Sequence, residues 1–482
     1  MHIIVIGGGL AGLAAAVRLR RRGIRDFLVL DRGDRVGGTW RDNTYPGAAC
    51  DVPSHLYSYS FALNPGWSRS FSPQPEIQAY IEKVARRYGA AEHQVTECEV
   101  LGARWREEAG LWEVETSRGT YEATVLVGAF GALCEPALPD IPGLASFAGE
   151  VHHSARWDHG TELAGKRVAV VGTGASAIQI VPAIAPHVAE LRVHQRTAPW
   201  VMPRLDRGYS RAERFACRWV PFYQRTWRAG LYWAHEAQAI ALAKVPALLK
   251  PVELLARAKL RREVRDPAVR RGLRPDYALG CKRILLSNTY YPAFNHDHVR
   301  LVTDAITEIR EKSVVTADGT EHPTDVLVFA TGFHVTDSPM YERITGADGR
   351  SLAEVFATVG RRCYKGTAIA GFPNMFLLVG PNTGLGHNSM IFMIESQVRY
   401  LLGALDAMRE RGLRRVEVRE DAQERFYQGL QSALARSVWN TGGCASWYLD
   451  RHGANTTMWP GFSYAFRRIT RTFDIDAYHI AR

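Results

Sequence analysis

Short apolar runs followed by glycine-rich turns dominate the hydrophobic pattern of this chain. The first run, Ile3–Ile6, leads into Gly7-Gly8-Gly9-Leu10-Ala11-Gly12, and a helical pattern continues from there to Arg22. A second apolar run, Phe27–Leu30, follows and ends at Asp31. Apolar runs of this length between turns are typical of buried parallel strands. The pattern therefore predicts a strand, turn, helix and strand at the start of the chain.

The same arrangement recurs in the middle of the chain. An apolar run at Arg167–Val171 precedes the turn Gly172-Thr173-Gly174-Ala175-Ser176-Ala177, and a helical pattern extends from this turn to about Ile184. The next apolar run covers residues 191–195 and ends at Arg196. Two such units predict two nucleotide-binding domains.

Weaker patterns complete these two units. We expect further strands at residues 112–116, 124–128, 314–317, 326–329 and 375–379, and a helix over residues 389–411. Residues 209–273 are rich in Ala, Leu, Arg and Trp at helical spacing, which predicts a helical insertion. The predicted fold class is α/β, with two Rossmann-like dinucleotide-binding domains and this insertion. The expected boundaries are 1–150 and 351–482 for the first domain, 151–205 and 281–350 for the second domain with its linker, and 206–280 for the insertion.

The first turn has the spacing of a dinucleotide site. Gly7 permits the tight turn, Gly9 lets the backbone approach a pyrophosphate, and Gly12 lets helix and strand pack closely. The helix N-terminus then faces the phosphates. Asp31 follows at about the distance along the chain where a carboxylate binds the ribose hydroxyls.

The second turn predicts a site for NADPH. Ala177 stands where a third glycine is usual, a replacement that the general pattern allows. The following strand ends in Arg196-Thr197, where an NAD site would offer a carboxylate. A guanidinium and a hydroxyl suit a ribose 2′-phosphate, which a carboxylate would repel. Two dinucleotide turns in one chain imply a flavin beside the nicotinamide.

Composition narrows the enzyme classes. The 482 residues, 46% hydrophobic and 23% charged, are typical of a globular protein with two or three domains. The seven cysteines include no Cys-x-x-Cys pair, which argues against a disulfide framework, a redox-active dithiol or a zinc ribbon. We therefore expect no metal site. The same absence argues against a disulfide reductase, so NADPH dehydrogenases and monooxygenases remain.

Charge and hydropathy bear on partners and location. The net charge is +11, but the arginines are spread along the chain without a recognisable nucleic-acid module, so we expect no nucleic-acid partner. No apolar run approaches the ~20 residues that span a bilayer, and no basic, apolar leader precedes the first strand. We expect a cytoplasmic monomer or homodimer without a transmembrane segment.

Two longer motifs resemble the signatures of the type I Baeyer–Villiger monooxygenases. The stretch from Gly37 to Asp51 matches Gly-Gly-x-Trp-x-x-x-x-(Phe/Tyr)-Pro-Gly-x-x-x-Asp at every fixed position. The stretch from Phe147 to Asp158 matches Phe-x-Gly-x-x-x-His-x-x-x-Trp-(Pro/Asp). The related enzymes that oxidise nitrogen or sulfur usually carry another residue at the position of Trp157. Similarity continues through residues 280–283, 329–333, 371–388 and 439–448, so it covers nearly the whole chain.

This resemblance implies FAD and NADPH as cofactors, O2 as co-substrate, and a ketone or aldehyde as substrate. NADPH would reduce the flavin, and the peroxyflavin formed with O2 would attack the carbonyl carbon to give an ester or lactone. The implied catalytic residues are Arg283, which keeps the peroxide deprotonated, and Asp51, which orients the arginine. Lys282 would bind the NADPH phosphate together with Arg196 and Thr197.

The same motifs imply further site residues. We expect cofactor contacts from Gly38, Thr39, Trp40, Tyr45, Asp51, Gly172, Gly174, Ser176, Ala330, Thr331 and Gly332. The linker residues Phe147, Gly149, His153, Trp157 and Asp158 are expected to gate the change between two cofactor states. A lone histidine such as His153 is also commonly a satisfied structural residue.

The remaining tryptophans predict packing rather than chemistry. We expect Trp200, Trp219, Trp227 and Trp233 to lie in the core or along a substrate channel. Trp439 and Trp447 flank a glycine-rich stretch, residues 440–444, which we expect to close over the site as a mobile loop.

Three other functions compete with ketone oxidation. A monooxygenase that oxidises sulfur or nitrogen would share the fold and cofactors but use a protonated hydroperoxyflavin, so Arg283 discriminates between the two. An NADPH oxidase or dehydrogenase would release peroxide stoichiometrically. A basic protein that binds nucleic acid or a membrane surface is supported only by the net charge and the Arg-rich helical segment.

Overall fold

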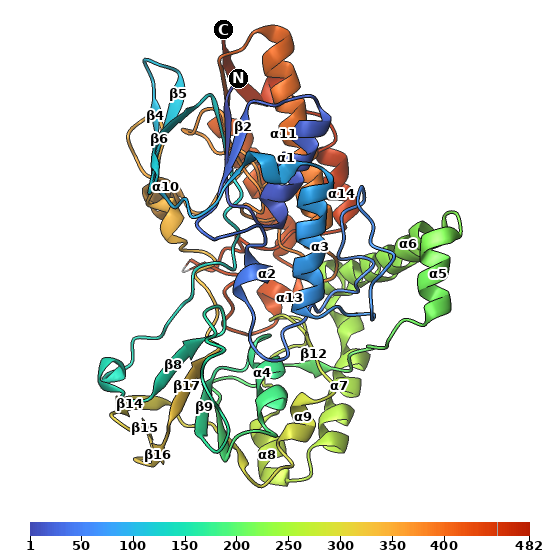
Figure 1. Ribbon diagram of the computed structural model, residues 1–482, viewed down its shortest axis with the longest axis vertical. Helices are drawn as coiled ribbons and strands as arrows, with labels where there is room; N and C mark the ends of the chain where they lie inside the picture. The colour runs from blue at the N-terminus through green and yellow to red at the C-terminus, as the bar shows by residue number, and fades with distance from the viewer. Residues whose placement is uncertain (451) are drawn as a thin grey trace.

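The computed structural model describes residues 1–450 and 452–482, and it places the two glycine turns in two separate sheets (Figure 1). The first sheet lies at the end of the molecule where both termini are found. The second sheet lies at the opposite end, and helices of the insertion project to one side (Figure 1). The α/β class predicted from the sequence is confirmed.

The first sheet is parallel and uses strands from both ends of the chain. Its order is β19-β7-β1-β2-β3, with β1 at Ile3–Ile6, β2 at Phe27–Leu30, β3 at Gln94–Val95, β7 at Val125–Gly128 and β19 at Met375–Leu377. The late strand β19 pairs with β7 in parallel, Met375 opposite Leu126. The C-terminal part of the chain therefore completes a sheet that the N-terminal part begins.

Both faces of this sheet are buried, which explains why its strands are continuous apolar runs. Ile3 and Val5 pack among helices α1 (Leu10–Arg21), α3 (Gln74–Arg87) and α11 (Met390–Arg411). Ile4 and Ile6 point to the other face, because side chains alternate along a strand. There they meet the antiparallel sheet β18-β4-β5-β6. Its strands are β4 (Val100–Arg106), β5 (Leu111–Thr116), β6 (Gly119–Ala123) and β18 (Ile344–Thr345).

The second sheet is also parallel, in the order β13-β10-β9-β17-β8. Its strands are β8 (Glu150–His153), β9 (Arg167–Val171), β10 (Glu190–His194), β13 (Val299–Val302) and β17 (Val326–Phe329). Helices α4 (Ala177–Ile184) and α9 (Tyr290–Ala293) cover one face. The other face packs on a small antiparallel sheet of β14 (Ile306–Arg310), β15 (Ser313–Thr316) and β16 (Glu321–Pro323).

The helical insertion leaves the second sheet and returns to it. It contains α5 (Arg211–Trp219), α6 (Tyr223–Glu236), α7 (Lys250–Glu263) and α8 (Pro267–Gly272), between the paired strands β11 (Val201–Met202) and β12 (Leu285–Leu286). Further elements are α2 (Thr39–Asp42), α10 (Leu352–Val359), β20 (Arg415–Val418), α12 (Glu420–Leu434), α13 (Val438–Thr441), α14 (Ser463–Ile469) and β21 (Tyr478–Ala481). None of the helices within the described residues is both long enough and apolar enough to cross a membrane.

The predicted elements differ from the observed ones mainly at their ends. The first helix ends at Arg21 rather than Arg22, and β10 covers Glu190–His194 rather than residues 191–195. The strand predicted to reach residue 379 ends at Leu377. Val379 has a φ of 61°, a left-handed conformation that cannot continue a strand.

Gly12→Ala is expected to disrupt the first turn, because a Cβ at Gly12 would lie 1.9 Å from the carbonyl oxygen of Gly7. The backbone must shift to relieve this overlap, at a cost of about 1–3 kcal/mol. We expect purified protein with little bound flavin and a lower unfolding temperature, measured by flavin absorbance and thermal unfolding. Gly230→Ala is the matched control, since a Cβ there meets no heavy atom within 4 Å. Equal flavin content in both variants would contradict this prediction.

Candidate active site

One large cavity lies between the two sheets, and both glycine turns open into it. Its volume is about 1760 Å³, whereas a pocket for one small ligand is typically roughly 300–1000 Å³. The predicted site residues that line it are Gly7, Gly9, Asp31, Gly38, Thr39, Trp40, Tyr45, Asp51, Gly172, Gly174, Ser176, Arg196, Thr197, Lys282, Arg283, Ala330, Thr331 and Gly332. Gly12 and the linker residues Phe147, Gly149, His153, Trp157 and Asp158 are not among the residues that line it. The cavity is therefore large enough for two dinucleotides and is bordered by both predicted sites.

The first turn is held in shape by close backbone contacts. Gly7 has a φ of 106°, and a Cβ on it would lie 2.6 Å from the carbonyl oxygen of Ala129. Gly12 packs against Gly7 itself. At Gly9, by contrast, the nearest atom to a Cβ would be the Cα of Gly38 at 3.6 Å. Gly7 and Gly12 thus fix the turn, while Gly9 leaves its backbone open to the cavity.

Asp31 lies at the end of β2, where a ribose ligand was expected, and its carboxylate already has partners. The backbone N–H of Gly8 donates to Oδ2 at 2.6 Å, and Arg41 Nη1 donates to Oδ1 at 2.6 Å. Arg41 stands at a variable position of the signature motif, so nothing in the sequence pattern singled it out. The Gly33 N–H also donates to Oδ1, at 2.8 Å. The carboxylate therefore fastens the turn to the following loop, and a ribose would share it with these three donors.

The second turn repeats this arrangement. Gly172 has a φ of 112°, and a Cβ on it would lie 2.5 Å from the carbonyl oxygen of Ala330, at the end of β17. A Cβ on Gly174 would meet no heavy atom within 4 Å. Gly174 therefore leaves open space at the start of α4, in the same way as Gly9 does in the first turn.

Two cations border the second turn without a carboxylate partner. Arg196 and Lys282 both line the cavity, and neither forms a salt bridge with any carboxylate of residues 1–450 and 452–482. Burial, and after it the charge of Arg196, lowers the pKa of the Lys282 ammonium. Like charges held close together favour an anion between them. Nearby, the buried Gln195 Oε1 has no hydrogen-bond partner among the described residues.

Arg283 and Asp51 form a two-pronged ion pair on the cavity wall. Arg283 Nε donates to Asp51 Oδ2 at 2.8 Å, and Nη2 donates to Oδ1 at 2.6 Å. The negative charge of Asp51 is the main reason why the pKa of Arg283 is raised. The arginine side chain is still 46% exposed, because it borders the cavity. The structure thus brings together two residues that lie 232 positions apart in the sequence.

Tyr45 and Gln179 join the signature loop to the second sheet's helix α4. Tyr45 Oη donates to Gln179 Oε1 at 3.0 Å. The backbone of Ala49 exchanges two hydrogen bonds with the same glutamine amide, at 3.2 and 3.0 Å. Trp40, in contrast, donates from Nε1 to Tyr57 Oη at 3.0 Å within its own unit. The loop that carries Asp51 is therefore fixed against the helix that begins at the second turn.

The linker histidine His153 is a satisfied buried residue. Its Nδ1 accepts from the Ala155 N–H at 3.1 Å, so Nε2 carries the proton and donates to the Gly332 carbonyl at 3.0 Å. Burial lowers the pKa of this imidazole, which keeps it neutral. His152, next to it, stacks on Trp157 with ring centroids 5.4 Å apart. His153 therefore anchors the linker to Gly332 on the cavity wall, and its gating role stays a prediction.

Comparisons with known proteins identify the family. Residues 4–210 match the family model described as pyridine nucleotide-disulphide oxidoreductase. The chain is 52% identical over 484 residues to a Baeyer–Villiger monooxygenase of Streptomyces coelicolor, covering 100% of this chain and 93% of the relative. The chain belongs to the Baeyer–Villiger monooxygenases. The resemblance expected from the two signature motifs is thereby confirmed.

Two further similarities support this membership. A Baeyer–Villiger monooxygenase of Pseudomonas aeruginosa is 46% identical over 480 residues, covering 99% of this chain and 91% of the relative. A crystal structure of OTEMO in complex with FAD and NADP is 27% identical, with a TM-score of 0.90, and the match covers 100% of this chain and 99% of that one. The fold of this monooxygenase is therefore shared along its whole length.

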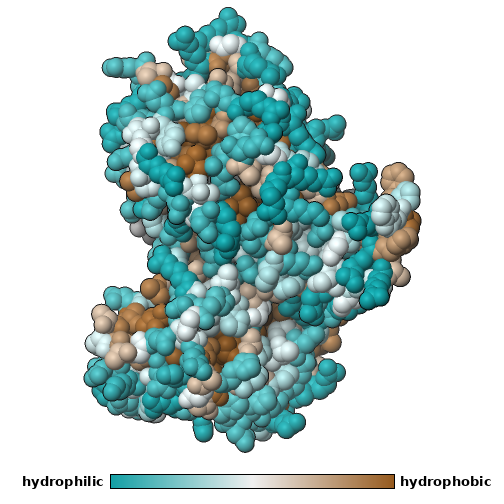
Figure 2. All heavy atoms as spheres, in the orientation of Figure 1, coloured by the Kyte–Doolittle hydropathy of each residue, from teal (hydrophilic) through white to brown (hydrophobic). Residues whose placement is uncertain are grey.

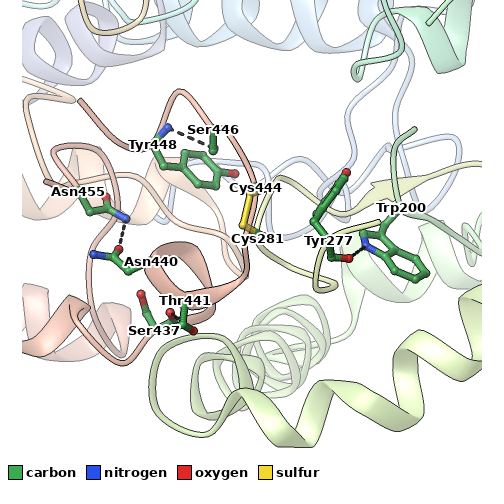
Figure 3. The surroundings of a disulfide bond; sticks show 10 residues. All are labelled: Trp200, Tyr277, Cys281, Ser437, Asn440, Thr441, Cys444, Ser446, Tyr448 and Asn455. Carbon is green, nitrogen blue, oxygen red and sulfur yellow. Dashed lines mark hydrogen bonds between the residues drawn. A yellow bond between two sulfur atoms is a disulfide. The ribbon is translucent and has the colours of Figure 1, made fainter. Parts of the chain in front are cut away.

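A disulfide bond joins Cys281 and Cys444 of this monooxygenase (Figure 3). Cys281 directly precedes Lys282 and Arg283, and Cys444 lies in the loop after α13. The cysteine pattern argued against disulfide bonding, and for this pair that interpretation is wrong. The two cysteines are 163 residues apart, so no local spacing marks them as partners.

The loop that follows Cys444 forms part of the cavity wall. Trp447 and Tyr448 line the cavity, and burial raises the pKa of Tyr448 to about 12. Trp439, on the other side of this loop, lies within α13 and is buried among apolar residues that include Leu242 and Met458. The disulfide ties this loop to the segment that carries Arg283 (Figure 3).

The tryptophans of the helical insertion contradict the expectation of core or channel packing. Trp200, which precedes the insertion, is buried as expected and donates to the Tyr277 carbonyl. Trp219, Trp227 and Trp233 are exposed, with 66% of Trp219 and 58% of Trp233 accessible. Helical spacing predicts that these residues share helices, but it does not reveal whether another element covers them.

A buried polar cluster around Glu236 links the insertion to the cavity, and the sequence pattern did not predict it. Glu236, at the end of α6, accepts hydrogen bonds from Asn388 Nδ2 at 2.7 Å and Ser463 Oγ at 2.8 Å. Despite the burial, which opposes ionisation, the pKa of Glu236 is lowered by His387 and these donors. Asn388 lines the cavity. The insertion is thus held firmly against the wall of the site.

Arg196→Ala is expected to raise the KM for NADPH by about 10- to 100-fold, because a charge-assisted hydrogen bond to the 2′-phosphate is worth about 1.5–3 kcal/mol. The KM for NADH should change little, since NADH lacks that phosphate. Steady-state kinetics with both nucleotides measures the difference. The matched control is Arg300→Ala, an exposed arginine on β13 outside the cavity. An equal loss with NADH would refute the assignment of Arg196 to the 2′-phosphate.

Cys444→Ser is expected to lower the free energy of unfolding by about 2–5 kcal/mol, because the disulfide closes a long loop. In denaturant, the wild-type protein should show five reactive thiols before reduction and seven after it. Reductant should lower the unfolding temperature of the wild type and of the control Cys217→Ser, which removes a free thiol. Reductant should leave the unfolding temperature of Cys444→Ser unchanged. Seven reactive thiols before reduction would show that the bond is absent in solution.

Proposed function

We propose that this monooxygenase uses NADPH and O2 to insert one oxygen atom beside the carbonyl group of a ketone or aldehyde. FAD binds at the first turn, in the domain formed by residues 1–150 and 351–482. NADPH binds at the second turn, in the domain formed by residues 151–205 and 281–350. The observation that carries this proposal is the Arg283–Asp51 pair on the wall of the cavity that both turns share. Membership of the Baeyer–Villiger family supports it.

The residues of the cavity fit two dinucleotides. Gly9 and Gly174 leave space at both turns where a pyrophosphate can approach the backbone. Arg196, Lys282 and Thr197 offer two cations and a hydroxyl to a 2′-phosphate. A relative of the same fold has been solved with FAD and NADP bound.

Arg283 provides a permanent positive charge where the reaction develops negative charge. When bound, FAD supplies the electrons that activate O2, after NADPH has delivered a hydride to it. Asp51 occupies Nε and Nη2 of the guanidinium, and Nη1 makes no hydrogen bond to the part of the chain that the structure describes. Nη1 therefore keeps its donors for an oxygen anion in the cavity, and a guanidinium does not lose its proton at working pH.

Asp51 acts as a positioning residue for Arg283. An arginine fork bound by both carboxylate oxygens has one orientation, so its remaining donors point in a fixed direction. The loop that carries Asp51 is itself held on α4 through Gln179. The arginine is thereby aligned by contacts that come from both domains.

This arrangement favours ketone oxidation over oxidation of sulfur or nitrogen. Attack on a carbonyl carbon requires a deprotonated, nucleophilic peroxide, whereas attack by sulfur or nitrogen requires a protonated one. A fixed guanidinium stabilises the anion and so favours the first reaction. Tyr448 lies near Arg283 and stays a neutral phenol, since burial raises its pKa to about 12.

Arg283→Ala is expected to lower ester or lactone formation by about 10²–10³-fold, the typical effect of removing one donor to a developing oxyanion. NADPH consumption should continue, with hydrogen peroxide released in place of the ester. The measurement is the yield of ester and of hydrogen peroxide per NADPH, with one cyclic ketone, one open-chain ketone and one thioether.

Arg283→Lys is the matched variant, since it keeps the charge but loses the two-pronged fork. It should recover part of the ester yield. Ester formation that survives Arg283→Ala would rule out the role given to this arginine. A thioether oxidised faster than either ketone by the wild type would make heteroatom oxidation the main activity.

A further inference from the structure

The two helices α5 and α6 form a hairpin that projects from the body of the molecule (Figure 1). Helix α5 contains no buried residue, although a capping box of Ser210 and Glu213 stabilises its start. A surface helix normally buries one apolar stripe against the protein. The apolar side of α5 therefore has no covering element within the described chain.

The end of this hairpin exposes an apolar surface. We call Phe215, Trp219, Val220, Phe222 and Tyr223 the aromatic tip. Phe215 is 63% exposed and Phe222 is 72% exposed. Figure 2 shows apolar surface on the outer edge of this projection, surrounded by polar side chains. Large exposed apolar side chains gathered in one place mark an interaction surface.

Arginines surround the aromatic tip. Arg211, Arg214 and Arg218 lie three and four positions apart, so they share one side of α5. Arg225 adds a fourth cation from α6. None of these four forms a salt bridge with a carboxylate in residues 1–450 or 452–482. The only acidic residue of α5, Glu213, is already bound by Arg207.

We propose that the aromatic tip docks on the surface of an anionic lipid bilayer. Aromatic and aliphatic side chains enter the boundary between headgroups and acyl chains, and arginines on the same helix bind lipid phosphates. The tip projects outward, and its four arginines form no salt bridge within the described residues; Arg218 lies over the ring of Trp219, 5.8 Å from its centroid. The tip therefore matches a soft, negatively charged surface in both shape and charge.

The same features disfavour two other occupants. A second copy of this chain would bring the arginines of one tip against those of the other, and like charges repel. A nucleic acid is usually held in a positively charged groove that follows its backbone, whereas the tip projects outward (Figure 1). A lipid surface is therefore the partner that the hairpin fits.

The hairpin is also anchored rigidly. Helix α6 ends at Glu236, whose carboxylate is fixed by Asn388 and Ser463 inside the protein. Arg228, earlier in α6, donates to the Ser58 carbonyl. Docking therefore fixes the orientation of the whole enzyme on the bilayer, with Asn388 of the cavity wall connected directly to the docked helix.

The test is co-sedimentation of the purified, flavin-loaded protein with vesicles. Vesicles of phosphatidylcholine alone are compared with vesicles containing about one-third phosphatidylserine, at low and at high salt. We expect binding to the anionic vesicles, weakened by salt. Replacing Phe215, Trp219 and Phe222 together by Ser should lower the partition coefficient about a hundredfold. The partition coefficient should fall about tenfold or more in the triple variant Arg211→Gln, Arg214→Gln and Arg218→Gln.

The matched control replaces three exposed arginines elsewhere, Arg86, Arg409 and Arg425, by Gln. It carries the same change in charge and should bind vesicles as the wild type does. NADPH oxidation in solution should be unchanged in all three variants, which shows that each is folded.

Three results would overturn the proposal. Equal binding by the wild type and the Ser variant would mean that the basic protein only adsorbs through its charge. A wild-type dimer that dissociates in the Ser variant would assign the tip to a second copy. Binding of a single-stranded oligonucleotide, lost in the same two variants, would assign it to nucleic acid.

Discussion

The ion pair between Arg283 and Asp51 is the constraint around which the rest of the structure is arranged. A guanidinium that is bound through two hydrogen bonds by one carboxylate has a single orientation, so each partner fixes the position of the other. Asp51 comes from a loop next to the first sheet, and Arg283 comes from the segment that follows the helical insertion. The two sheets must therefore meet at one distance and orientation, and the contacts of Gln179 with the Asp51 loop maintain that arrangement.

Both dinucleotide turns pack closely against the backbone of a neighbouring strand in the same way. Gly7 and Gly172 each lie against a carbonyl oxygen at the end of a neighbouring parallel strand, Ala129 in one sheet and Ala330 in the other. These contacts leave no room for a side chain, which is why glycine is required there. The segments after those strands are thus part of each turn, although they are remote from it in sequence. This explains why Ala330 belongs to the site without belonging to a glycine motif.

Local patterns in the sequence were sufficient for the two central sheets and their glycine turns, whereas the other predicted residues of the cavity wall came from the family resemblance. Apolar runs located the central strands to within about a residue or two, and the glycine spacing located both turns. Three features depended on contacts between distant segments and could not be predicted. These are the Cys281–Cys444 disulfide bond, the ion pair between Arg41 and Asp31, and the exposure of the Trp219 side chain. In the first two, tertiary packing brings together residues that are distant in the sequence. In the third, tertiary packing leaves the tryptophan without an element that covers it.

The late entry of β19 into the first sheet has a consequence for biosynthesis. A ribosome delivers the chain from its N-terminus, and domains generally fold as they emerge. All strands of the second sheet lie between Glu150 and Phe329, so that sheet can form while the rest of the protein is still being made. The first sheet must wait for Met375–Leu377, and α1 must wait for α11. The first sheet is therefore completed after the second, and the flavin that we propose to bind at its turn can be held only once Met375–Leu377 have been made.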